Sequence, residues 1–264
     1  MKILTLGDVC APDGVKALVK ALPLIKRELG ADAVIVNGEN SARGNGISLS
    51  SADDIFAAGA DVITGGNHTL RHREIHNALD ENPFLLRPHN LDTPYGSGYC
   101  LLDKGKALIA VINLIGRVYL DSVQATNPFL AADELICKAK QDGANIILVD
   151  FHAEATSEKR ALGFYLDGKV TAVFGTHTHV QTADAGVLEN GTGYVTDLGM
   201  SGVENSVLGV KKEIIINRLR NGDTSKFEFE QGNCLICGCL FEADPKSGLC
   251  VKAQNICRSV DLER

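Results

Sequence analysis

The sequence has no apolar run long enough to cross a bilayer. A membrane-spanning helix needs about 18 consecutive apolar residues or more, and no segment of the 264 residues approaches that length. Met1-Lys2 leads directly into Ile3–Leu6, an apolar run too short for the core of a secretory signal peptide. We therefore expect a soluble, cytoplasmic protein with no membrane partner.

The chain also lacks an excess of basic residues. Its 26 Lys and Arg are outnumbered by 33 Asp and Glu, which gives a formal net charge of -7. Extended nucleic acids and anionic membranes bind basic surfaces, so we expect no extended nucleic-acid binding. A small phosphorylated ligand remains compatible with this charge, because bound divalent cations reverse the local potential.

No linker, low-complexity tract or repeat divides the sequence, so we expect one α/β domain over residues 1–264. Strands are expected at Lys2–Leu6, Ala33–Val36, Val62–Thr64, Ala107–Leu114, Ile146–Asp150 and Val170–Phe174. Helices are expected at Gly14–Glu28, Ser50–Ala58, Arg71–Leu79, Pro128–Gln141 and Ser157–Leu166. These strands are continuously apolar, which is typical of sheets covered by helices.

The pattern changes after Gly186. A run of strands is expected there, forming an antiparallel sheet in the same domain, at Tyr194–Asp197, Val210–Arg218, Lys226–Glu230, Cys234–Phe241 and Leu249–Ala253. Cys234, Cys237 and Cys239 have part of a zinc-site spacing, but no second cysteine or histidine pair completes four ligands. We favour buried free thiols over a structural metal. This apolar strand could belong to the core or to the interface of a homo-oligomer.

Five separated segments end a predicted strand with side chains that bind metals. They are Gly7-Asp8, Gly38-Glu39-Asn40, Gly66-Asn67-His68, Asp150-Phe151-His152 and Gly175-Thr176-His177-Thr178-His179. Ligands of α/β folds collect at the carboxyl ends of strands, where all five segments lie. Each segment alone is also explained by a helix cap or a turn, but together they favour a binuclear metal site.

The ligand types define the metals that would suit this site. Asp8, Glu39 and Asn40 offer hard oxygen atoms, and Glu39 can bridge two cations with its two oxygens. Residues i and i+2 of an extended segment face the same side, so His177 and His179 could serve two ions, with the adjoining threonines as inert spacers. Oxygen and imidazole ligands without thiolate favour two Fe or Mn ions, with Zn as the alternative.

Three other histidines have simpler explanations. His72 and His76 have the i, i+4 spacing that can bind a metal, but no Glu lies between them as in a zinc-protease helix. We assign both to the exposed face of a helix. His89 lies in a predicted loop, where it could line a pocket, although we favour an ordinary loop residue.

The strand-end motifs resemble those of calcineurin-like metallophosphoesterases, most specifically Gly66-Asn67-His68 and Gly175–His179. The segments 37–42, 150–159 and 196–200 further resemble the YmdB-type bacterial 2′,3′-cyclic-nucleotide 2′-phosphodiesterases, and this resemblance runs nearly end to end. It implies a four-layer α/β/β/α sandwich of two mixed sheets flanked by helices. It also implies two metal ions and a small phosphodiester or cyclic-nucleotide substrate.

The resemblance assigns a role to each strand-end residue. One ion would be held by Asp8, Glu39, Asn40 and His179. The other would be held by Glu39, Asn67, His152 and His177, with Glu39 as the bridge. His68 would approach the phosphate and the leaving oxygen rather than a metal.

The sequence departs from the broad pattern at three places. Asp8-Val9-Cys10 replaces the usual Asp-x-His, so Asn40 is expected to supply an oxygen ligand instead. Thr69-Leu70-Arg71 follows His68, where Trp and an acidic residue are expected, and Arg43-Gly44-Asn45-Gly46 replaces a loop richer in glycine. These changes affect substrate fit more than metal binding.

The expected reaction is hydrolysis of a phosphodiester by in-line attack of metal-bound hydroxide. His68 would protonate the leaving oxygen as a general acid, and 2′,3′-cyclic nucleotides would yield 3′-nucleotides. Arg43, Arg71 and Arg117 are all candidates for phosphate binding. The alternatives are a phosphomonoesterase or nuclease at the same site, and a metal-binding regulatory protein of signalling or RNA turnover with slow phosphoesterase activity.

Overall fold

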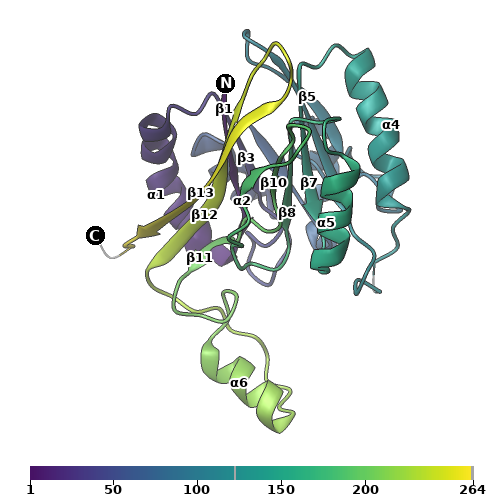
Figure 1. Ribbon diagram of the computed structural model, residues 1–264. Coiled ribbons are helices and arrows are strands. Elements are labelled where there is room, and N and C mark those ends of the chain that lie inside the picture. The colour runs from purple at the N-terminus through teal and green to yellow at the C-terminus, as the bar shows by residue number, and fades with distance from the viewer. Residues whose placement is uncertain (122, 263–264) are drawn as a thin grey trace.

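Two mixed sheets lie face to face in the computed structural model, which describes residues 1–121 and 123–262 (Figure 1). Within these residues, the first sheet has the strand order β2-β11-β12-β1-β3-β4, with β13 paired to β12. Its strands are β1 (Lys2–Leu6), β2 (Asp8–Val9), β3 (Ala33–Asn37), β4 (Val62–Thr64), β11 (Met200–Val203), β12 (Cys234–Ala243) and β13 (Cys250–Val260).

The second sheet has the order β5-β6-β7-β8-β10-β9. Its strands are β5 (Tyr99–Asp103), β6 (Leu108–Ile115), β7 (Ile146–His152), β8 (Ala172–Thr176), β9 (Gly186–Val187) and β10 (Gly193–Val195). The pairs β1–β3, β3–β4, β6–β7 and β7–β8 are all parallel. The strands in each of these parallel groups therefore end at a common edge of their sheet.

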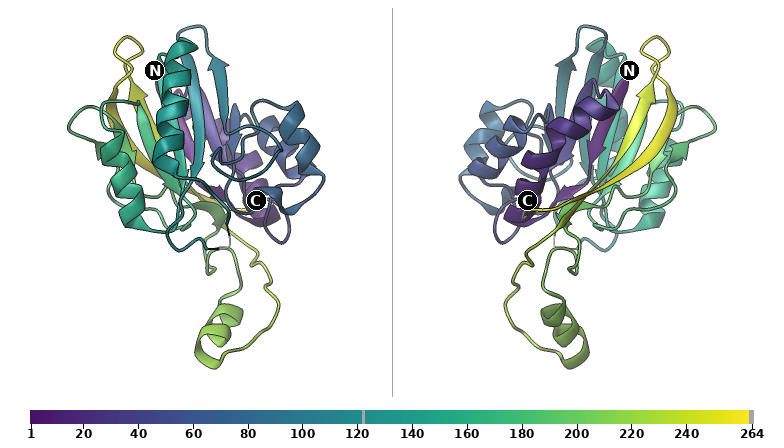
Figure 2. Two further views of the ribbon diagram at one scale, coloured as in Figure 1. Left: turned by 90° about the vertical axis from the view of Figure 1, so that its right-hand side faces the viewer. Right: turned by 90° about the vertical axis from the view of Figure 1, so that its left-hand side faces the viewer.

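Helices cover the outer faces of both sheets (Figures 1 and 2). The helices are α1 (Ala11–Leu29), α2 (Leu49–Ala57), α3 (Ile75–Glu81), α4 (Pro128–Gln141), α5 (Thr156–Tyr165) and α6 (Lys212–Asn221), with a 3-10 turn at Thr69–Arg71. Helices α1 to α3 pack on the first sheet, and α4 and α5 pack on the second.

Three apolar layers separate these four structural layers, because successive residues of a strand point to opposite faces. Leu4 packs toward α1 and α2, whereas its neighbour Ile3 packs between the sheets. Phe174 and Phe241 meet in the middle layer, with ring centroids 6.1 Å apart. The α/β/β/α sandwich of two mixed sheets is confirmed, and so is the inference that continuously apolar strands are buried on both faces.

Residues 204–233, which we call the arm, leave the sandwich between β11 and β12 and carry α6 away from it (Figures 1 and 2). The prediction of a strand at Val210–Arg218 is wrong, because Lys212–Asn221 forms α6 and ends at Gly222 in the left-handed conformation. The prediction at Lys226–Glu230 is also wrong, since a single bridge between Phe229 and Val210 stands in its place.

Other boundaries differ from the predictions in smaller ways. Leu249–Ala253 is the first part of the longer β13, and β12 and β13 extend the first sheet instead of forming a separate one. Arg71–Leu79 divides into the 3-10 turn and α3. Within the described ranges, no helix combines the length and the apolarity needed to cross a bilayer.

Candidate metal centre

The loops after β3, β4, β7 and β8 bring four of the predicted ligands together. His152 Nε2 lies 3.3 Å from Glu39 Oε1, 2.9 Å from Asn67 Oδ1 and 3.1 Å from His177 Nδ1. Ligand atoms of Glu39, His152 and His177 all lie within 4.8 Å of one another. Strand ends of both sheets therefore contribute to one cluster.

The other predicted ligands lie around the same Glu39 carboxylate. His179 Nε2 lies 3.7 Å from Asp8 Oδ1 and 3.2 Å from Asn40 Nδ2, and the same Asn40 nitrogen donates to Glu39 Oε1 at 2.9 Å. Asp8 Oδ2 accepts a hydrogen bond from the backbone of His177 at 3.0 Å. Glu39 thus lies between the two groups of side chains.

Two oxygens of this cluster lack the hydrogen bonds that buried oxygens normally have. Asp8 Oδ1 and Asn40 Oδ1 are buried, and neither has a hydrogen-bond partner among residues 1–121 and 123–262. An unpaired buried oxygen is energetically costly, and hard oxygens bind divalent cations readily. The donors present, carboxylates, amide oxygens and imidazoles, therefore fit the metal ions that the sequence predicts.

The electrostatics of the cluster also favour a cation. Burial acts to raise the pKa of Glu39, but His152 and His68 outweigh it and hold this pKa at about 2. Burial acts to lower the pKa of His152, but the Glu39 carboxylate prevails and raises it to about 9. Burial and the charge on His152 lower the pKa of His177 to about 3. The carboxylates around His152 therefore create a negative potential, which favours a bound cation.

A buried relay orients His152. Its Nδ1 lies 2.9 Å from Thr176 Oγ1, and Thr176 donates to Asp150 Oδ1 at 2.7 Å. Because the Thr176 proton goes to Asp150, we assign the proton of the neutral imidazole to Nδ1, which leaves the Nε2 lone pair facing the cluster. Such partners fix the orientation of metal-binding histidines.

The expectation that the threonines are inert spacers is therefore wrong. Thr176 belongs to the His152 relay, and Thr178 donates from both its backbone and its hydroxyl to Asp197 Oδ2, at 3.1 and 2.8 Å. Lys159 Nζ approaches the same oxygen at 2.6 Å in a buried ion pair. Asp197 and Lys159 thus fasten the loop that carries His177 and His179.

That loop is not extended, contrary to the prediction from the i, i+2 spacing. Strand β8 ends at Thr176, and His177 and His179 have φ values of 100° and 64°. Such positive values are uncommon for residues other than glycine. The turn, rather than the alternation of a strand, directs His177 toward His152 and His179 toward Asp8.

Gly66 has a steric role in the site. A Cβ at this position would lie 2.2 Å from Glu39 Oε2 and 2.3 Å from His152 Nε2. Only glycine leaves these ligand atoms the space that they occupy, which is the physical reason for glycine before Asn67-His68.

His68 lies at the edge of the cluster. Its backbone nitrogen donates to Glu39 Oε2 at 3.0 Å, and its ring Nε2 lies 3.2 Å from Asn67 Nδ2. Burial lowers its pKa, opposed by the Glu39 carboxylate. The ring lines a cavity rather than the center of the cluster, which fits a group that faces a substrate.

A cavity of about 740 Å³ opens over the cluster. Its lining includes Glu39, Asn40, His68, His177, His179 and, from the arm, Leu208, Val210, Lys226, Phe227 and Phe229. Of the three arginine candidates, Arg71 lines this cavity. Arg43 lines neighbouring cavities instead.

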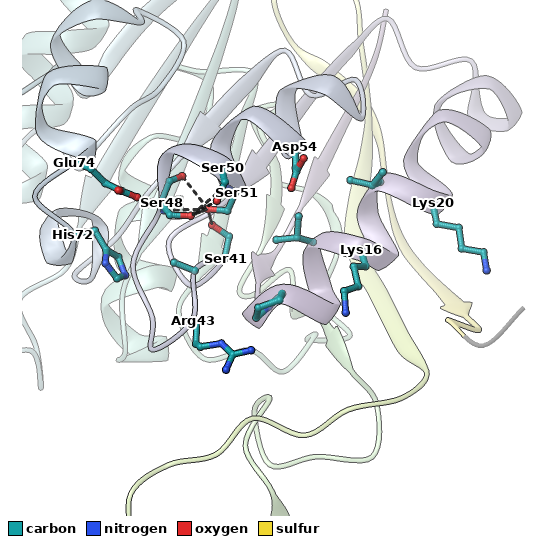
Figure 3. A pocket seen from close by; sticks show the side chains of 14 residues that line it. Lys16, Lys20, Ser41, Arg43, Ser48, Ser50, Ser51, Asp54, His72 and Glu74 are labelled. Atoms are coloured by element: carbon teal, nitrogen blue, oxygen red, sulfur yellow. Dashed lines mark hydrogen bonds between the residues drawn. The ribbon is translucent and has the colours of Figure 1, made fainter.

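A second cavity, of about 650 Å³, lies between α1 and α2 (Figure 3). The hydroxyls of Ser41, Ser48 and Ser51 are joined by hydrogen bonds on one wall, and Lys16 and Arg43 also line it. None of the seven predicted metal ligands lines it in the described part of the chain. The metal centre and its cavity are separate from this hollow.

The remaining histidines lie outside the ligand cluster. His72 Nε2 contacts the Asn45 carbonyl at 2.9 Å, and the His76 ring stacks on Tyr95 with centroids 4.2 Å apart. His89 lines another cavity, on the second-sheet side of the molecule.

The cysteines that we expected as free thiols are free and mostly buried. Cys234, Cys237 and Cys239 are buried in β12. Cys10 Sγ lies 3.4 Å from His179 Nδ1, and burial together with the Asp8 charge raises the pKa of this thiol well above its usual value.

The protein has a metallophosphoesterase-type fold: a four-layer sandwich with metal-binding residue types at its strand ends. The NAD nucleotidase of Haemophilus influenzae shares this fold, with a TM-score of 0.64 and 12% identity over 99% of this chain and 56% of that one. At this level of identity the likeness concerns the fold alone.

Sequence comparison then places the chain in a family. The chain belongs to the YmdB-like protein family, whose model matches residues 4–256, which confirms the resemblance seen in its motifs. It is 41% identical over 258 residues to a Bacillus subtilis protein named 2′,3′-cyclic-nucleotide 2′-phosphodiesterase, covering 97% of this chain and 96% of the relative. A Mycoplasma pneumoniae structure described as a novel phosphatase has a TM-score of 0.92 and 36% identity, covering 99% of this chain and 94% of the other.

Proposed function

We propose that the protein is a binuclear-metal phosphodiesterase that hydrolyses 2′,3′-cyclic nucleotides to 3′-nucleotides. The observation that carries this proposal is the pair of unpaired buried oxygens, Asp8 Oδ1 and Asn40 Oδ1, in the same cluster as Glu39, His152 and His177. The substrate class rests on the name of the Bacillus subtilis relative.

The side chains divide into two ligand sets that share one carboxylate. Asp8, Asn40 and His179 would hold one ion, whereas Asn67, His152 and His177 would hold the other, and Glu39 would contact both. When bound, such a pair of ions activates water near neutral pH and neutralises charge on the phosphate. The chain's own part is to fix the ligand positions, through Asp150, Thr176 and Asp197.

His68 is proposed to protonate the leaving 2′-oxygen. It lines the cavity beside the ligands, and its position is set by its backbone bond to Glu39. Burial favours the neutral ring, so the negative charge of a bound phosphate would supply the attraction that favours the imidazolium. General acids of this kind contribute on the order of 10²–10⁴-fold in rate.

The test is a substrate screen of the protein loaded with Mn²⁺ or Fe²⁺. We expect turnover of 2′,3′-cyclic AMP, with the position of the product phosphate assigned by phosphorus NMR as the 3′-monoester. A 2′-monoester product would contradict the proposed leaving group. Failure to cleave either the cyclic nucleotide or bis-p-nitrophenyl phosphate would contradict the diesterase activity and favour a regulatory metal-binding protein.

Phosphomonoesterase activity is the second candidate, because the Mycoplasma pneumoniae structure is described as a phosphatase. The same screen distinguishes the two with p-nitrophenyl phosphate. A kcat/KM for this monoester above that for the cyclic nucleotide would make monoester hydrolysis the principal activity.

A further inference from the structure

The cavity over the metal centre has two chemically different sides. Metal-ligand candidates and His68 form one side, whereas Leu208, Val210, Phe227 and Phe229 of the arm line the cavity with apolar surface. Arg71 and Lys226 add positive charge to the same lining. A ligand that is phosphorylated at one end and flat and apolar at the other would match both sides.

Backbone hydrogen bonds hold the base of the arm in place. Phe229 forms a bridge with Val210, and on either side of it Lys211 donates to the Glu228 carbonyl and Glu230 donates to the Gly209 carbonyl, each at 2.9 Å. The Lys211 and Glu228 side chains also form an ion pair at 2.6 Å. The Phe229 ring is therefore carried by a paired segment rather than by a free loop.

This segment lies next to the metal ligands. A Cβ at Gly209 would lie 3.4 Å from Cys10 Cβ and 3.8 Å from the Phe229 ring. Cys10 Sγ in turn lies 3.4 Å from His179 Nδ1. The Phe229 ring thus lies beside Gly209, Gly209 lies beside Cys10, and Cys10 contacts the proposed ligand His179.

The second ring of the arm is partly occupied by its own neighbour. The Arg218 guanidinium lies 4.2 Å from the centroid of the Phe227 ring. The guanidinium therefore covers one face of Phe227. Among the described residues, no Lys or Arg stacks on the Phe229 ring. Of the two rings, Phe229 is half-buried, has the better-fixed backbone and carries no stacked guanidinium among the described cation contacts.

We propose that Phe229 is the platform on which the nucleobase of the substrate stacks, with Phe227 and Leu208 completing the apolar wall. This inference rests on the proposed function. It makes the arm a specificity element: the metal centre would act on the phosphodiester, and the arm would select a diester that carries a base. Stacking on an aromatic ring tolerates every base, so the preference would be for nucleotides rather than for one nucleotide.

The test compares two cyclic diesters that differ in the base alone, 2′,3′-cyclic AMP and methyl riboside 2′,3′-cyclic phosphate. For Phe229→Ala we expect the KM for the cyclic nucleotide to rise about 10- to 100-fold, from the loss of one base–aromatic stack. Its kcat should stay within about twofold, and the kcat/KM for the baseless diester should not change. Phe229→Trp keeps an aromatic ring at this position, so its KM for the cyclic nucleotide should stay near that of the parent protein. Leu219→Ala, also in the arm but outside the cavity lining, is the matched control.

An equal loss on both diesters would overturn the inference, because Phe229 would then be supporting the metal centre. No loss on either would overturn it as well. If the parent protein cleaves neither diester, the proposed function fails, and the Kd of adenosine 3′-phosphate against ribose 3-phosphate decides the inference separately. A preference for the nucleotide that Phe229→Ala removes would support it, whereas equal Kd values would refute it.

Discussion

The metal centre and the arm border one cavity, but they are held in place by different means. Asp8, Glu39 and His152 are almost fully buried, and each forms a hydrogen bond with a residue near the end of another strand. All ten residues of α6 are described, and none of them is buried. The proposed metal ligands are held at the ends of buried strands. The arm is held mainly by the short pairing at its base.

The residues proposed for catalysis and the residues proposed for substrate selection thus lie in parts of the molecule that are anchored differently. The residues proposed to bind metal come from the rigid edge of two sheets, where small displacements would cost packing energy. The residues proposed to contact the base come from a segment whose exposed side chains can change without disturbing the core. Substrate preference can therefore vary within this fold while the metal centre stays the same.

The largest effect should come from removing a ligand at the rigid edge. Asp8→Ala or His177→Ala should lose at least one ion and nearly all turnover, because each removes a proposed ligand that no neighbour replaces. Metal analysis of the dialysed proteins, with circular dichroism as the control for folding, measures this. Full metal content in both variants would show that these residues are not ligands.

His68→Ala should separate metal binding from catalysis. The backbone donor to Glu39 remains in this variant, so both ions should stay bound, while kcat falls by about 10²–10⁴-fold for loss of a general acid. Metal analysis and steady-state kinetics on one sample give both values. A protein stripped of its ions would show that His68 is a ligand instead.

A smaller effect is expected from the relay behind His152. Thr176→Val removes the acceptor of the His152 Nδ1 proton at almost constant volume, and should weaken metal affinity by about 10- to 100-fold. Competition with a chelator measures this affinity. Unchanged affinity, with an unchanged urea midpoint, would mean that the turn at 177–179 orients the ligands without the relay.

The smallest effect should come from the outer part of the arm. Leu219 is 82% exposed, so Leu219→Ala should change the free energy of unfolding by less than about 0.5 kcal/mol. Leu148, which is fully buried between the sheets, is the matched control, and Leu148→Ala should cost about 2–5 kcal/mol. A cost for Leu219→Ala near that of Leu148→Ala in urea denaturation would show that α6 is covered by another surface in solution.

The sequence predicts the elements of the sandwich well, for identifiable reasons. Asn127 and Pro128 mark the start of α4, where Asn127 accepts from the Phe129 nitrogen as an N-cap. Glycine shortly before acidic, amide or imidazole residues marks four of the five strand ends, and Asp150-Phe151-His152 is the exception. Parallel strands then bring those ends together whatever the details of the loops.

The arm was mispredicted because its local signals conflict. Ile214, Ile215 and Ile216 form a β-branched run that favours a strand, yet the surrounding Lys, Glu and Arg favour a helix. Gly222 lies between the two strands predicted here, and it caps the helix instead. None of the side chains of α6 is buried, so packing against the core does not decide between helix and strand.

The relay around His152 was missed for a different reason. Asp150 lies within an apolar strand and Thr176 beside a histidine pair, so each has an ordinary local explanation. The signal that could have revealed these hydrogen bonds is the Asp150 carboxylate inside a continuously apolar strand, because a buried charge needs partners. The partners of Asp150 are Asn37 in β3, Thr64 in β4 and Thr176 in β8, which a linear pattern does not bring together.

The most direct test of the central claim is the anomalous diffraction of crystals of the Mn²⁺-loaded protein. The account predicts two metal peaks about 3.5–4 Å apart, with Asp8, Asn40 and His179 around one, Asn67, His152 and His177 around the other, and Glu39 in contact with both. A single peak, or peaks away from these residues, would contradict it.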